Sequence, residues 1–289
     1  MHFVFLAILF FFFQNIANKE YGARFVPGVK TLVPFHVISH AAMILSLLAL
    51  GVKIQMPLNG LLYAFLYACT FLAAIMMLMR TLTLGAVGKT TLIVNLSMLL
   101  PMLLGVLFWE EKLNLFNIFG IPCVLLTLFL SVPKKNGEEK VNAGWTLSVL
   151  ITFVLDGALS VIQKLFLRAC GSDYSVSFVL VSALFGLGIT VIVSMLFWAK
   201  DHALSIPKGK PLIPFIIIAV IVGASTGIAT MFNMQSLTLL DGVIVFPVRQ
   251  GGLILMMTLY GIIRCKDKFD LRTAVMLLSG LAGIVLLNL

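Results

Sequence analysis

Ten apolar stretches follow one another along this chain, and they constrain its fold more than any other feature. A helix needs about 20 mostly apolar residues to cross a bilayer. Only 11% of the 289 residues are charged, whereas a soluble domain has roughly a quarter. The sequence therefore predicts an all-α integral membrane protein with ten transmembrane helices. The predicted helices cover residues 2–22, 32–51, 58–80, 85–109, 114–132, 145–168, 175–199, 212–235, 242–263 and 271–288.

The composition excludes several other classes. The first segment, "MHFVFLAILFFFFQNIANKE", has no basic start and no small-x-small cleavage site, so we expect a retained helix rather than a signal peptide. The four cysteines show no CxxC spacing, and no zinc site or disulfide framework is predicted. The net charge of +9 comes from short connectors without a basic stripe. These connectors suit anionic lipid headgroups, and no nucleic acid partner is expected.

One polar connector, "PKKNGEEKVNAG" at 133–144, divides the chain into two halves that resemble each other. Each half has five predicted helices, so the halves must enter the membrane in opposite directions. We therefore predict two inverted five-helix repeats, residues 1–133 and 144–289, joined by a loop at 134–143. This architecture is typical of secondary transporters. The matches are "RTLTL" (80–84) with "QSLTL" (235–239), "EKLN" (111–114) with "DKFD" (267–270), and Lys19 with Lys164.

Polar side chains recur at helical spacing inside six of the predicted helices. Polar residues are costly inside a bilayer and usually face a cavity or a partner, so the stripes predict a central polar cavity. The predicted substrate ligands are Gln14, Asn15, Tyr63, Tyr67, Asn95, Ser160, Gln163, Asn233, Arg249 and Gln250, with Asp156 and Lys164 as proton-coupling groups or counter-ions. Asn18, Lys19, Thr70, Thr91, Thr226 and Thr230 continue the same stripes.

Arg249 and Asp156 are the sharpest features, and each has two interpretations. Arg249 either faces the cavity, where its guanidinium binds a carboxylate or phosphate, or its side chain reaches back to the headgroups or pairs with Asp156. Asp156 is either a proton-coupling carboxylate or the counter-ion of Lys164 or Arg249. Pro247 removes a backbone hydrogen bond just before Arg249, which suits an irregular helix that lines a cavity.

Two segments carry a resemblance to a known family. "NLSMLLPMLLGVLFWEEKLNLFNIFG" (95–120) and "FPVRQGGLILMMTLYGIIRCKDKFD" (246–270) resemble the fourth and ninth helices of EamA-type transporters in the drug/metabolite transporter superfamily. This chain departs from the pattern at Met256, near the position that matches Pro101, and at Cys265. The resemblance implies a central cavity lined by helices one, three, four, six, eight and nine. It also implies that Glu110 or Glu111 has a structural role near the positive end of the following helix.

The orientation in the membrane stays open. Connectors after odd-numbered helices and their flanks carry fifteen Lys and Arg residues, and those after even-numbered helices carry four. The positive-inside rule then puts both termini outside, whereas the resemblance implies cytoplasmic termini. The first group is Lys19, Arg24, Lys30, Arg80, Lys89, Lys134, Lys135, Lys140, Lys200, Lys208, Lys210, Arg264, Lys266, Lys268 and Arg272; the second is Lys53, Lys112, Lys164 and Arg168.

The sequence favours a secondary transporter that moves a small polar, anionic or zwitterionic metabolite by alternating access. A translocase for lipid-linked or amphiphilic substrates on the same fold is the alternative. A membrane enzyme is less expected, because no clustered carboxylates or nucleophile–base pair appear, and no catalytic residue or cofactor is predicted. His36 and His40 lack a third ligand, so no metal is expected. We expect a monomer or weak homodimer in a bacterial inner or plasma membrane, with the substrate and the bilayer as partners.

Overall fold

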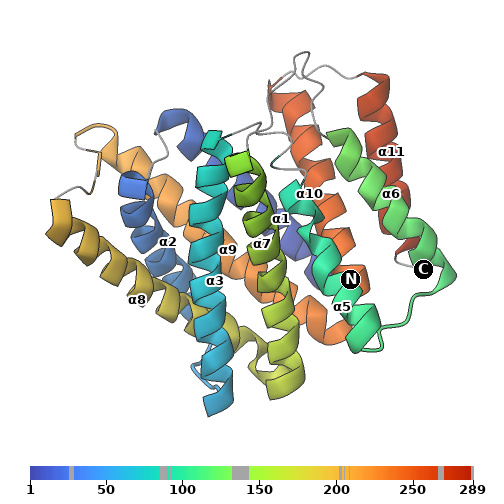
Figure 1. Ribbon diagram of the computed structural model, residues 1–289, viewed down its shortest axis with the longest axis horizontal. Coiled ribbons are helices and arrows are strands. Elements are labelled where there is room, and N and C mark those ends of the chain that lie inside the picture. The colour runs from blue at the N-terminus through green and yellow to red at the C-terminus, as the bar shows by residue number, and fades with distance from the viewer. Residues whose placement is uncertain are drawn as a thin grey trace.

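The computed structural model is all-helical in the part of the chain that it describes, residues 1–25, 29–84, 90, 93–131, 143–201, 204, 206–207, 209–265 and 270–287. Helical segments lie in each of the ten predicted stretches (Figure 1). They are α1 (His2–Arg24), α2 (Val29–Ala49), α3 (Leu58–Leu84), η1 (Leu96–Met98), α5 (Leu99–Phe108), α6 (Leu115–Ser131), α7 (Ala143–Cys170), η2 (Ser172–Tyr174), α8 (Ser175–Asp201), α9 (Leu212–Leu239), α10 (Gly242–Cys265) and α11 (Leu271–Leu286).

Seven of these helices are long and apolar enough to cross a membrane, namely α1, α2, α3, α7, α8, α9 and α10. The segment Ile93–Phe108, α6 and α11 are apolar but shorter. The prediction of an all-helical, multi-pass membrane protein is confirmed. The predicted loop at 134–143 lies outside the described residues except for Ala143, and so do Lys89, Thr91 and most of "DKFD".

The helices pack in pairs that come from opposite halves of the sequence. Helix α1 packs along α9, and α3 packs along α7. Helix α2 contacts both α9 and α8, and α8 also contacts α3. At the other side of the molecule α6 lies beside α11, and α10 bridges α6, α1 and α5 (Figure 1). The interior therefore lies between helices of the first half and helices of the second half.

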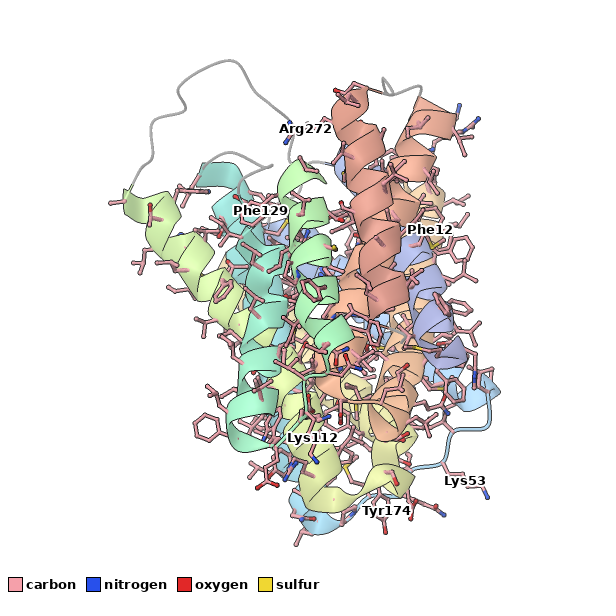
Figure 2. The ribbon with its side chains drawn as sticks, turned by 90° about the vertical axis from the view of Figure 1, so that its right-hand side faces the viewer. Phe12, Lys53, Lys112, Phe129, Tyr174 and Arg272 are labelled. Atoms are coloured by element: carbon pink, nitrogen blue, oxygen red, sulfur yellow. The ribbon has the colours of Figure 1, made fainter. Side chains whose placement is uncertain are left out.

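Four described connections lie at the same end of the bundle. Lys53 between α2 and α3, Lys112 between α5 and α6, and Tyr174 before α8 all lie at one end, whereas Arg272 at the start of α11 lies at the other (Figure 2). The turn between α9 and α10 belongs to the first of these ends, because Glu111 contacts the start of α10. At the opposite end, Asp270 caps α11 by accepting a hydrogen bond from the backbone N–H of Thr273 at 2.8 Å.

Two glycines allow α9 to pack closely on α2. A Cβ atom added to Gly223 would lie 2.0 Å from the backbone oxygen of Ser39, and one added to Gly227 would lie 2.8 Å from Cγ of Met43. The Ser39 hydroxyl donates to the Ala219 carbonyl at 3.1 Å across the same interface. This is the Gly-x-x-x-Gly packing that membrane helices use where backbones touch. This contact was not predicted from the sequence.

Candidate functional site

A line of four hydrogen-bonded side chains crosses the interior, and we call these residues the polar chain: Tyr67, Gln163, Asn233 and Arg249. Gln163 on α7 donates to the Tyr67 hydroxyl on α3 at 3.2 Å. Asn233 on α9 donates to the Gln163 side-chain oxygen at 3.0 Å. Arg249 on α10 donates to the Asn233 side-chain oxygen at 3.4 Å. Gln163 and Asn233 are buried, so the polar chain joins four helices inside the bundle.

The guanidinium of Arg249 lies among side chains in the interior. Its Cζ atom lies 5.5 Å from the ring centre of Phe11 on α1 and 5.7 Å from that of Phe246. A guanidinium has five N–H donors, and among the described residues Arg249 donates only to Asn233 and forms no ion pair. Aromatic faces stabilise its charge, and four donors remain for another acceptor.

Asp156 on α7 lies near Arg249 but does not pair with it. Its carboxylate accepts a hydrogen bond from the hydroxyl of Ser97 in η1. The two charges attract each other, yet no ion pair joins them among the described residues. Lys164 does not pair with Asp156 either. The interior thus holds a fixed positive group and an acidic group that interact electrostatically. Neither forms an ion pair with a side chain in the part of the chain that the structure describes.

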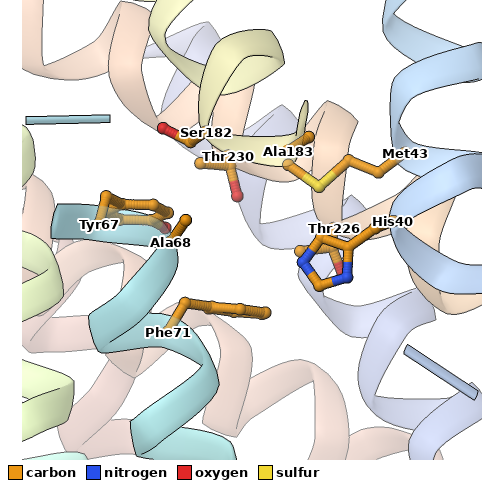
Figure 3. A pocket seen from close by; sticks show the side chains of 9 residues that line it. All are labelled: His40, Met43, Tyr67, Ala68, Phe71, Ser182, Ala183, Thr226 and Thr230. Carbon is orange, nitrogen blue, oxygen red and sulfur yellow. The ribbon is translucent and has the colours of Figure 1, made fainter. Parts of the chain in front are cut away.

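A small cavity of about 20 Å³ adjoins the polar chain at Tyr67, and Thr230 on α9 also lines it (Figure 3). It has room for about one water molecule, far less than the roughly 300 Å³ of a metabolite site. The Ser182 hydroxyl on its wall has no hydrogen-bond partner among the described residues. His40 lies on the opposite wall, where its Nδ1 contacts the His36 carbonyl at 2.8 Å, so Nδ1 carries the proton and Nε2 is an acceptor. A metabolite can enter here only if the helices move apart.

Lys164 pairs with a different acid from the one expected. Its ammonium lies 2.5 Å from the Glu111 carboxylate, and both residues are 8% exposed. Glu111 also accepts from the backbone N–H groups of Gly242 at 3.2 Å and Val243 at 3.0 Å. The interpretation of Asp156 as the counter-ion of Lys164 does not fit this geometry. Glu111 neighbours a positive helix end as the resemblance implied, but the helix is α10 rather than the following one, α6.

The remaining predicted site residues do not join the polar chain. Asn15 donates to the Phe11 carbonyl of its own helix at 2.7 Å. Tyr63 packs edge-on against Phe166, with 6.3 Å between ring centres. Ser160 is buried on α7, and Gln14, Asn95 and Gln250 are half-buried without a hydrogen bond to the polar chain. Within the described residues, no group of three His, Cys, Asp or Glu side chains could hold a metal.

Three residues that contact the predicted site were not predicted from the sequence. Phe11 and Phe246 stack on Arg249, but nothing in the sequence distinguishes them among 23 phenylalanines. Ser97 binds Asp156 from another helix, and no spacing rule links the two positions. Thr230, by contrast, was predicted to face the interior, because it lies at helical spacing from Thr226 and Asn233.

Comparison with known proteins shows the fold and leaves the family open. No protein-family model matches the chain, and no curated protein matches it. A solved structure titled only "Crystal structure of protein" matches with a TM-score of 0.75 and 18% sequence identity. The match covers 98% of this chain and 94% of that one. The whole chain therefore has a fold already seen in a crystal.

Proposed function

We propose that this protein is a secondary transporter of the EamA type, in the drug/metabolite transporter superfamily. It moves a small polar, anionic or zwitterionic metabolite by alternating access to a site between two inverted repeats. We further propose that the protein lies in a bacterial inner membrane. The support comes from helix pairing, from the helices that form the polar chain, and from the charge of Arg249.

The helix pairing supports the inverted repeat. If residues 1–133 correspond to residues 144–289, then α1 corresponds to α7, α3 to α9 and α5 to α10. The contact of α1 with α9 then has its counterpart in α7 with α3, and that of α1 with α10 in α7 with α5. The contacts of α2 with α8 and of α6 with α11 are their own counterparts. In transporters with such pseudo-symmetry the substrate site lies at the interface of the repeats, which supports the proposed location of the site.

The helices around Arg249 support the resemblance to EamA-type transporters. The polar chain comes from α3, α7, α9 and α10, while Phe11 comes from α1 and Ser97 from η1. In the order of the predicted spans these are helices one, three, four, six, eight and nine. The resemblance implies a cavity lined by these same six helices.

The observation that carries the proposal is that Arg249 has unused hydrogen-bond donors and no ion-pair partner in the described part of the chain. It is a permanent positive charge inside the bundle with one long hydrogen bond and no carboxylate partner among the described residues. Arginine binds carboxylate or phosphate through two parallel hydrogen bonds, so a substrate with such a group completes its coordination. Asp156 interacts electrostatically with Arg249, and among the described residues its only hydrogen bond comes from Ser97. We propose that it receives the positive group of a zwitterionic substrate, which adds zwitterions to the class.

The nearly closed interior supports alternating access. The cavity beside Tyr67 has room for about one water molecule, so this conformation does not admit a metabolite on that side of the polar chain. A carrier passes through such a closed state between its two open ones. Transport then runs on a substrate or ion gradient, because the sequence holds no P-loop.

Replacing Arg249 with glutamine tests the proposal. Purified protein is screened for thermal stabilisation by anionic, zwitterionic, neutral and cationic metabolites. We expect stabilisation by anionic or zwitterionic compounds, weakened about 30-fold or more in apparent affinity by Arg249→Gln, since a charge-assisted hydrogen bond contributes about 2 kcal/mol or more. Arg264→Gln is the matched control, because Arg264 is an exposed arginine in the last turn of the same helix.

The thermal stabilisation by added compounds shows whether Arg249 binds substrate or only supports the fold. Arg264→Gln is expected to keep the full stabilisation by the same compounds. Undiminished stabilisation in a folded Arg249→Gln protein would remove Arg249 from the substrate site. Stabilisation by neutral or cationic compounds alone would contradict the proposed substrate class.

A further inference from the structure

We infer that Glu111 is the latch of a gate at the end of the bundle that carries the α9–α10 turn. Its carboxylate ties the chain after α5 to α7 and to the start of α10, and substrate reaches the polar chain from that end only after these contacts break. This inference rests on the proposed carrier function and adds the residue that controls one of its two openings.

The carboxylate of Glu111 is held on three sides. It receives the Lys164 ammonium at 2.5 Å and the N–H groups of Gly242 and Val243 at 3.2 and 3.0 Å. These N–H groups open α10 and have no partner within that helix, and the helix dipole adds positive potential at this point. Burying a carboxylate and an ammonium costs their hydration. The attraction between the two charges and the two hydrogen bonds from α10 offset that cost.

The chain between α5 and α6 is shaped to present this carboxylate. Glu110 adopts a left-handed conformation with φ of 57°, which turns the chain directly after α5. The N–H of Glu111 donates to the Gly105 carbonyl at 3.1 Å. A Cβ atom at position 105 would lie 2.5 Å from Oε2 of Glu111, so glycine leaves the space that the carboxylate occupies.

Lys164, the partner of Glu111 in the latch, lines an outer cavity and is next to a residue of the polar chain. A cavity of about 330 Å³ lies at the α9–α10 turn and is lined by Lys164, Asp241 and residues 237–240 and 244. This volume is in the range of a metabolite site. On α7 the residue next to Lys164 is Gln163 of the polar chain. On α10, Arg249 lies about 10 Å deeper than Gly242 at about 1.5 Å per residue.

The latch joins the two proposed repeats. Glu111 belongs to residues 1–133, whereas Lys164 and the start of α10 belong to residues 144–289. Alternating access moves one repeat against the other around a fixed site, so a bond between the repeats at one end must break when that end opens. When the bond breaks, water can hydrate the Glu111 carboxylate and the Lys164 ammonium, which lowers the cost of opening. An apolar contact of equal size gains no such hydration.

Accessibility of a cysteine behind the latch tests the inference without any substrate. The reporter is Ser160→Cys in a protein whose four cysteines are replaced by alanine, because Ser160 is buried one turn deeper than Lys164 on α7. A membrane-impermeant maleimide is added to either side of oriented vesicles. We expect Glu111→Gln and Lys164→Met each to accelerate labelling about tenfold, and only from the side of the α9–α10 turn. The labelling rate is proportional to the population of the state open at that end, so an about tenfold larger open population gives an about tenfold faster rate.

Glu110→Gln is the matched control, since Glu110 is the neighbouring carboxylate and is exposed. It is expected to label at the unmodified rate. Lys164→Met keeps both bonds from Glu111 to α10, so it decides the outcome if Glu111→Gln does not give a monodisperse protein. Unchanged labelling in monodisperse latch variants, or equal acceleration from both sides, would overturn the latch and leave the carrier standing. One-sided acceleration supports the latch, and if no compound then shows saturable counterflow, the carrier function fails separately.

Discussion

Alanine at Gly223 is expected to lower the thermal unfolding midpoint of the purified protein by about 5 °C or more. The new methyl group would lie 2.0 Å from the Ser39 carbonyl oxygen, and this atom belongs to the backbone of α2 rather than to a flexible side chain. Helices α2 and α9 must therefore separate, which breaks the bond from the Ser39 hydroxyl to the Ala219 carbonyl. Overpacking of this kind costs about 3 kcal/mol, and about 2 °C is lost per kcal/mol in a chain of this size.

Gly188→Ala is the control for this substitution. Gly188 also lies within a long membrane helix, α8, but no atom lies within 4 Å of a Cβ placed there. Alanine favours a helix over glycine by about 1 kcal/mol, so the midpoint of Gly188→Ala should stay the same or rise. Equal midpoints for the two variants would show that α2 and α9 do not touch at Gly223.

The helices could be predicted from the sequence because a bilayer fixes their length and apolar character. The predicted span 58–80 begins at the first residue of α3, Leu58, and 242–263 begins at the first residue of α10. The ends were less accurate where hydrophobic sequence continues past the polar residues, as in α9, which runs to Leu239. Apolar runs say which segments are helices, but they do not say which helices touch. The Gly-x-x-x-Gly spacing of Gly223 and Gly227 could have identified one such contact.

The candidate site could be predicted as faces of helices but not as pairs of residues. Helical spacing indicated that Gln163 and Asn233 face the interior, but it left two interpretations of Arg249 open. The polar chain joins all three. The same spacing put Lys164 and Asp156 on one face, yet their partners come from other helices. Glu111 and Ser97 reach them because of how α5 and η1 pack on α7. Such contacts depend on tertiary packing, which periodicity along one helix does not contain.

Aspartate at position 233 is expected to abolish the stabilisation by anionic ligands while the protein stays folded. Asn233 accepts from Arg249 at 3.4 Å and is nearly isosteric with aspartate. The new carboxylate lies beside the guanidinium and becomes the counter-ion that Arg249 lacks among the described residues. It then competes directly with a substrate carboxylate or phosphate for the same donors. Apparent affinity should fall about 100-fold, since an intramolecular charge-assisted pair contributes about 3 kcal/mol.

The thermal midpoint of ligand-free Asn233→Asp separates this explanation from simple damage. The gain from pairing Arg249 offsets the cost of burying a second charge, and Gln163 can present its amide group to the new oxygen, so the midpoint should change by less than about 4 °C. Asn233→Leu is the contrasting variant. It leaves the side-chain oxygen of Gln163 without its donor and the guanidinium of Arg249 without its acceptor. Because residue 233 is only 1% exposed, water does not replace these bonds and the midpoint should fall. If Asn233→Asp still binds anionic compounds with unchanged affinity, the guanidinium of Arg249 is not their ligand. A loss of anion binding at a preserved midpoint would follow directly from competition for one arginine.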